Sequence, residues 1–219
     1  MAQLKWHQTG DREIESGVSE VILFPMGESD YDNGVAWNGV TAINENPSGA
    51  DVTDLYADNI KYASLRSAEK FGLTIEAYAY PDEWGECDGS KEVKTGVYFG
   101  QQPRKVFGLC YKTMIGDESH PGMNKGYKLH LIYQCTAAPS GRGYTTINDN
   151  PDAISFSWEA TSTPVAVTGH KDTSEIVVDS TKADADNLAN LIDMLYGTAN
   201  SSSELPDPDT VLSTLHVSG

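Results

Sequence analysis

The sequence has few basic residues for its length. Its 219 residues include 15 lysines and arginines against 32 aspartates and glutamates, a formal net charge of −17 at pH 7. A nucleic-acid-binding protein needs a basic surface to hold phosphates, and a peripheral membrane protein needs one to hold anionic lipid. The charge therefore excludes an ordinary DNA- or RNA-binding protein and a protein held electrostatically on a membrane.

Cysteines are also few, and they lie far apart. Cys87, Cys110 and Cys135 form no CxxC pair of the kind that holds a structural zinc ion. An odd number of widely spaced cysteines is a poor disulfide framework. We expect three reduced thiols, at least two of them in strands.

Long hydrophobic runs are absent. No apolar run approaches the roughly 20 residues of a membrane-spanning helix. The start, MAQLKWHQTGDRE, is polar and lacks the apolar segment of a signal peptide. We expect no contact with a membrane. We expect the chain to be made and kept in a cytosol-like compartment. Hydrophobic residues make up 39% of the chain, which is enough for a globular core.

The common catalytic motifs are missing too. The sequence contains no P-loop, no GxSxG and no HExxH, and no GxGxxG after a strand. We interpret His130 as a solvated or satisfied strand residue. A Cys110–His130 pair on adjacent strands stays open, although the acidic background disfavours a reactive thiolate. We therefore expect no enzyme, no catalytic residue and no cofactor. The histidines are scattered singly at His7, His120, His130, His170 and His216.

Acidic clusters offer minor alternatives. Asp82, Trp84 and Asp88 combine carboxylates with an aromatic ring, which is typical of sugar sites. SDYDNG, residues 29–34, begins like a calcium loop but lacks the glycine and final glutamate of an EF-hand at their required positions. NDNPD, residues 148–152, is equally well a turn. We assign no metal ligand and leave a surface divalent ion open.

Apolar and polar residues alternate through most of the chain, the pattern of half-buried strands. Clusters of Gly, Asn, Asp and Pro separate these segments. The pattern predicts a mainly β, antiparallel sandwich or barrel. The expected strands are 18–24, 71–80, 93–99, 105–115, 127–135, 153–161 and 175–178. The expected core residues are Leu73, Ile75, Phe107, Leu109, Leu129, Leu131, Ile154, Phe156 and Trp158.

One helix is expected, at about 182–196, with an apolar stripe that packs on the outside of a sheet. Thr181 is its expected N-cap and Gly197 its C-cap. The tail, about 198–219, combines a flexible connector with LPDPDTVLSTL. We interpret that last segment as a terminal strand, or as an arm that packs on a neighbour.

Residues 44–67 are long, polar and rich in small residues, and we interpret them as a loop. Loops of more than about 15 residues inside a compact domain are usually functional. Tyr56, Ile60 and Tyr62 lie within it. These side chains pin the loop either to its own domain or to another subunit, and we favour the second interpretation.

Several segments resemble the major tail tube protein of long-tailed (siphovirus-type) bacteriophages. They are residues 35–90, 96–116 and 126–165 and the segment LPDPDTVLSTL. The runs NxxPSGA, LYADNIKY and TINDNP carry most of the likeness. The resemblance implies a single tail-tube domain over 1–219, a two-sheet antiparallel β-sandwich with one flanking helix.

The resemblance also implies a function. Such subunits form hexameric rings that stack into a tube for DNA ejection, and terminal arms such as 1–14 and 198–219 often contribute. The implied partners are other copies of the chain and tape-measure, tail-tip and tail-terminator proteins, in a virion tail assembled in the host cytoplasm. The implied subunit-interface residues are Tyr56, Asp58, Asn59, Ile60 and Tyr62. Another phage structural module, such as a head decoration or head–tail joining protein, and a glycan-binding β-sandwich remain alternatives.

Acidity has a physical use in a tube. Six copies carry about −100 per ring at formal charge. A lumen lined with carboxylates repels phosphate, so DNA passes through without specific binding. We expect segments 71–80 and 127–135 to line the lumen, because their outer faces are polar.

Overall fold

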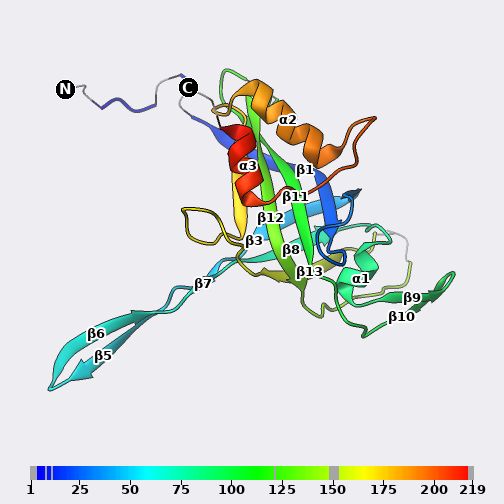
Figure 1. The fold of residues 1–219 in the computed structure, drawn as a ribbon, viewed down its shortest axis with the longest axis horizontal. Helices are drawn as coiled ribbons and strands as arrows, with labels where there is room; N and C mark the ends of the chain where they lie inside the picture. Colours follow the sequence, from blue (N-terminus) through cyan, green and yellow to red (C-terminus); the bar gives the residue numbers. More distant parts are fainter. Residues whose placement is uncertain (1–3, 8, 11, 121, 148–152, 217–219) are drawn as a thin grey trace.

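The computed structural model describes residues 4–7, 9–10, 12–120, 122–147 and 153–216 (Figure 1). The fold is mainly β, with antiparallel sheets and few helices, so the expected fold class is confirmed. Within the described ranges, no helix is long and apolar enough to cross a membrane.

One eight-stranded sheet forms the body, in the order β2–β1–β11–β12–β13–β8–β3, with β14 also paired to β12. β12 belongs to both halves of this sheet, because residues 128–132 pair with β14 and residues 135–137 pair with β13. The sheet therefore bends into two layers, and β11 and β12 cross over β8 and β13 in Figure 1. Its strands are β1 (Ile14–Pro25), β2 (Val35–Ala36), β3 (Val40–Glu45), β8 (Gly72–Ala77), β11 (Phe107–Gly116), β12 (Gly126–Ala137), β13 (Phe156–Ser162) and β14 (Glu175–Asp179).

The main core lies between the two layers. Trp84 is its centre, with ring centroids 4.6 Å from Trp37 and 5.3 Å from Trp158. Close packing of large aromatic rings buries much apolar area and makes the core hard to change without cost. Five of the expected core residues lie here, namely Leu73, Ile75, Phe107, Leu109 and Trp158.

Two of the other expected core positions differ. Ile154 precedes β13 and is 38% exposed, so its predicted burial is wrong. Phe156 is half-buried and packs against the rim of the main core. Strand β13 begins only at Phe156. The alternation of apolar and polar residues before Phe156 therefore does not lie in the sheet, and it does not place Ile154 in the core.

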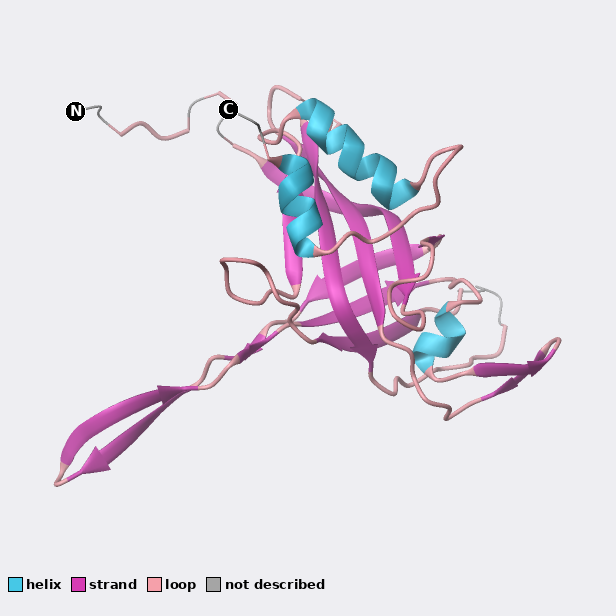
Figure 2. Cartoon of the chain, viewed as in Figure 1, coloured by secondary structure: helices cyan, strands magenta, loops and turns pink. Residues whose placement is uncertain are grey.

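A second core covers the outer face of β1, β11, β12 and β14. α2 (Ala185–Tyr196) packs on it through Leu188, Leu191 and Leu195, as the apolar stripe predicted (Figure 2). Asp184, not Thr181, is the N-cap, since its side chain accepts hydrogen bonds from the Asp186 and Asn187 amides. The cap thus lies three residues later than expected.

The end of the chain is a helix, not the expected strand. α3 (Pro208–Leu215) begins at Asp207, whose side chain accepts from the Thr210 amide. Val211 is fully buried in the second core beside α2. The segment therefore packs on its own chain here, in contrast to an arm on a neighbour.

Strand β12 contributes side chains to both hydrophobic cores. Leu129 and Leu131 point into the second core, and Ile132 points into the main one. His130 is also buried. Lys128 and Gln134 of this strand stay partly exposed and His130 borders an open cleft, so the lining of a lumen by 127–135 stays a prediction. Thr74 and Glu76 of β8 remain partly exposed.

Candidate functional site: two exposed hairpins

Residues 44–67 form a projecting β-hairpin, not an irregular loop. β5 (Val52–Ala57) pairs with β6 (Ile60–Arg66), and a short ladder of β4 (Ser48–Gly49) and β7 (Glu69–Lys70) lies at its base. Figure 1 shows the pair extending away from the body at one end of the longest axis. The prediction of an irregular loop is therefore wrong, although the segment does project from the body of the fold.

A two-residue turn closes this hairpin. Asp58 and Asn59 both have positive φ, at 51° and 63°, which is the geometry of a type I′ turn. Asp and Asn tolerate this region better than most residues because their short side chains bond locally. The Asp54 carboxylate binds Lys61 Nζ at 2.8 Å and accepts from Ser64, and these contacts lower its pKa. Asp58 and Asn59 thus shape the tip.

One face of the hairpin is almost wholly apolar. The register places Thr53 opposite Leu65, Leu55 opposite Ala63 and Ala57 opposite Ile60. Thr53, Leu55 and Ala57 alternate onto one face of β5, and their partners in β6 share that face across a register shift between Leu55 and Tyr56. Five of the six are apolar, and no layer of the body covers them.

The predicted interface aromatics are exposed. Tyr56 is 69% exposed and Tyr62 is 75% exposed. The interpretation that they pin the segment to its own domain is therefore wrong. Contact of Tyr56, Asp58, Asn59, Ile60 and Tyr62 with another subunit stays a prediction.

A second hairpin projects from the opposite end of the molecule (Figure 2). β9 (Lys91–Lys94) pairs with β10 (Val97–Phe99), where the sequence predicted one continuous strand over 93–99. Gly96, with φ of 76°, permits the turn between them. Its exposed apolar side chains are Val93, Val97, Tyr98 and Phe99. The turn signal Thr95–Gly96 was present in the sequence, but the alternation across it hid the break.

The candidate sugar site is not supported. α1 (Trp84–Asp88) buries Trp84 completely, so its ring cannot stack on a sugar. Asp88 is instead ion-paired with Arg142. Of the acidic turns, 29–34 brings no third ligand near Asp30 and Asp32 among the described residues, and 148–152 lies outside them.

The cysteines are buried free thiols, and all three have raised pKa values because of burial. Cys110, on β11, points into the second core, where burial raises its pKa to about 12. His130 faces the other side of the sheet, beside Tyr111. The two side chains therefore form no nucleophile–base pair, although their strands are adjacent as expected.

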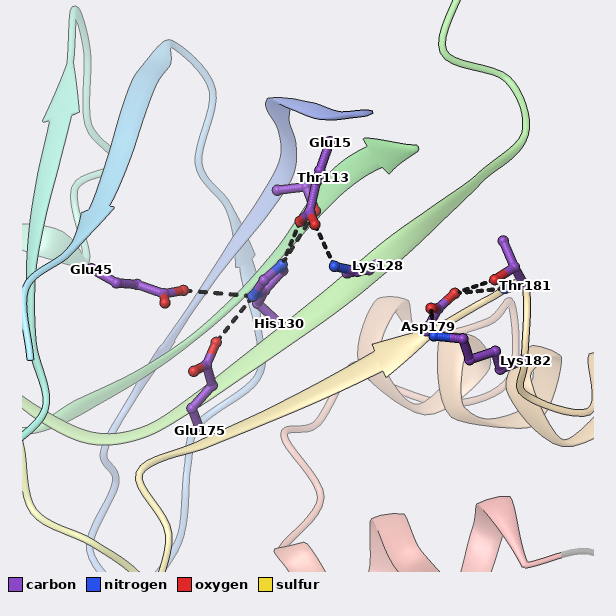
Figure 3. Close-up of polar contacts among 9 residues, drawn as sticks. All are labelled: Glu15, Glu45, Thr113, Lys128, His130, Glu175, Asp179, Thr181 and Lys182. Atoms are coloured by element: carbon purple, nitrogen blue, oxygen red, sulfur yellow. Dashed lines mark hydrogen bonds and ion pairs between the residues drawn. The ribbon is translucent and has the colours of Figure 1, made fainter. Parts of the chain in front are cut away.

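A polar cluster surrounds the buried His130, and no local pattern in the sequence indicates it (Figure 3). His130 Nδ1 lies 3.0 Å from Glu175 Oε1 and 3.6 Å from Glu45 Oε1. Burial raises the pKa of Glu45, and the nearby Glu175 charge adds to this. In the described part of the chain, this is the one group of three such side chains close enough to hold a metal ion.

Comparison with models of known protein families finds no match to this sequence, and comparison with curated proteins finds none either.

Proposed function

We propose that this protein is a structural virion subunit that assembles into the tail tube of a long-tailed bacteriophage. The observation that carries the proposal is the pair of apolar hairpins at opposite ends of the body, β5–β6 and β9–β10. Contacts between two different patches are heterologous, and repeated heterologous contacts give rings or filaments. The resemblance of the sequence segments supplies the family.

The β5–β6 hairpin has the form of an assembly arm. An isolated two-stranded hairpin is marginally stable in water, and an exposed apolar face usually marks an interaction site. The six residues of β5 span about 20 Å at the rise of an extended strand. The arm is therefore long enough to lay its Leu55 and Ile60 face on a neighbouring copy, and hexameric rings stacked through such arms form the proposed tube.

The charge agrees with a conduit for DNA. Each copy carries −17, so a closed ring repels phosphate from any surface that displays its carboxylates. Glu76 on the outer face of β8 is one such carboxylate that stays partly exposed. We propose β8 and β12 as lumen strands, as the sequence predicts.

Electron microscopy tests the proposal. Purified protein at high concentration, or with tail-tip proteins as nucleus, is expected to form rings or tubes in negative stain. Immunogold label on virions is expected along the tail. Label on the head would contradict the proposal and support a head decoration protein instead.

A further inference from the structure

The cluster around His130 joins three strands that lie far apart in the sequence. Glu45 ends β3, His130 lies in β12 and Glu175 begins β14. Their ligand atoms all lie within 4.8 Å of one another, and His130 is only 9% exposed. We propose that Glu45, His130 and Glu175 bind a divalent transition-metal ion such as Zn²⁺. This site is separate from both hairpins and does not depend on the proposed function.

Thr113 decides which histidine nitrogen carries the proton. Its hydroxyl oxygen lies 2.5 Å from Glu15 Oε1 and 3.2 Å from His130 Nε2. An ionised carboxylate only accepts, and Lys128 pairs with Glu15, so the single Thr113 proton goes to Glu15. The Thr113 oxygen then accepts from the Nε2–H of His130. Nδ1 is then left with a lone pair, and the Glu45 and Glu175 carboxylates point toward this side of the ring (Figure 3).

Two carboxylates that face a lone pair need a cation or a shared proton between them. In the described ranges, the ion pairs of Glu45 and Glu175 are to His130 alone, with no lysine or arginine. A proton on Nδ1 or on one of the carboxyl groups satisfies them, and so does a metal ion. The outer contacts match those of metal sites, where the second nitrogen of a ligating histidine donates to a fixed acceptor.

The geometry suits a small ion. Tetrahedral zinc with bonds of about 2.0–2.1 Å needs ligand atoms about 3.3 Å apart. The two distances from Nδ1, 3.0 and 3.6 Å, lie on either side of this value. One nitrogen and two oxygens favour Zn²⁺ or a similar ion over Ca²⁺ and Mg²⁺, which prefer all-oxygen sites. An open cleft beside Thr74 and Glu76 leaves room for a water as fourth ligand.

The ion links the two layers of the fold. Glu45 lies on β3 at the end of one layer, whereas His130 and Glu175 belong to the other. A bound metal stabilises the native state by mass action, because the unfolded chain lacks the site. At a hundred-fold excess over Kd, we expect Tm to rise by about 5–10 °C for a chain of this size.

Calorimetric titration of Zn²⁺ into chelator-treated protein tests the site. Excess Mg²⁺ occupies weak surface carboxylates during the measurement. We expect one saturable equivalent, and at least ten-fold weaker binding in Glu175→Gln. Glu45→Gln, at an exposed position, is expected to weaken binding equally. His120→Gln is the matched control, because His120 also contacts a carboxylate, that of Asp117, but has no third ligand.

Nitrogen NMR of the histidine rings distinguishes a proton on His130 Nδ1 from a metal ion bound there. Zinc is expected to move the His130 Nδ1 resonance and leave the Nε2 proton in place. Absence of saturable binding would overturn the proposal, as would a His130 ring that stays doubly protonated at pH 7 with zinc present. Equal zinc binding by Glu45→Gln, Glu175→Gln and the native protein would also overturn it.

Discussion

The ring of Tyr111 lies parallel to the imidazole of His130, with centroids 4.5 Å apart and 5° between the planes. The same phenol donates a hydrogen bond to Glu45. Tyr111 thus holds the orientation of one group and the position of another. It comes from β11, the strand that pairs with β12.

Tyr111→Phe keeps the stack and removes the hydrogen bond. We expect it to cost about 1–2 kcal/mol of the free energy of unfolding, because a bond to a charged group is lost but Glu45 can still reach water. Zinc affinity is expected to fall about ten-fold, as for other changes around metal ligands. Urea unfolding and calorimetry measure the two effects. Tyr127→Phe is the control, and an equal loss in both variants would contradict the assigned role.

Asp179 makes the free energy of unfolding depend on pH in the acid range. Burial alone would raise its pKa, but hydrogen bonds from Thr181 and Lys182 outweigh burial and hold the pKa at about 2, against an ordinary 3.8. A lowered pKa means that the stabilisation is complete above about pH 4 and is lost as the pH falls through 2.

Asp179→Asn is therefore expected to lose no more than about 2 kcal/mol at pH 7, since one pKa unit corresponds to about 1.4 kcal/mol. The difference from the native protein should shrink below pH 4 and vanish near pH 2. Denaturant unfolding over this range measures it. Asp193→Asn, on the exposed side of α2, is the control. A difference that stays constant from pH 7 to pH 2 would contradict the linkage.

Trp84 is a core residue, and its change should affect folding rather than sugar binding. Trp84→Ala is expected to cost about 3–5 kcal/mol, because it leaves a large cavity among Trp37, Phe107 and Trp158. Trp84→Phe should cost less, since it also removes an indole N–H that has no hydrogen-bond partner in the described chain. Thermal unfolding measures both. Glycan binding by the native protein that is lost in a folded Trp84→Phe variant would revive the sugar site.

The pattern of apolar and polar residues predicted the strands of the main sheet but not the projecting hairpins. Period-two alternation identified β8, β11, β12 and β13, because each faces a core on at least one side. It failed for β5 and β6, where no body layer imposes an inside and an outside. The signal there was two runs of strand-forming residues around Asp58–Asn59, a turn without the usual glycine.

Sequence patterns missed the C-terminal helix and the cluster around His130 for different reasons. LPDPDTVLSTL reads as extended because of its prolines, yet Pro208 stands in the first turn of α3, where proline is favoured. Glu45, His130 and Glu175 come from three distant strands, so no spacing rule brings them together. Only the pairing of β12 with β14 and the bend of the sheet do so.

The proposed assembly depends on the β5–β6 hairpin, and Leu55→Asp tests its apolar face. We expect an unchanged circular dichroism spectrum and Tm, because Leu55 contacts no core, but loss of rings and tubes. Tyr56→Ala is expected to shorten the tubes with the same spectrum. Tyr144→Ala, an exposed aromatic outside both hairpins, is the control and should assemble normally.

Negative-stain electron microscopy of the native protein beside Leu55→Asp is the most direct measurement. We expect rings or tubes from the native chain and from Tyr144→Ala, and single particles from Leu55→Asp. A native protein that stays monomeric at high concentration and with tail-tip proteins, or tubes of normal length from Leu55→Asp, would contradict it.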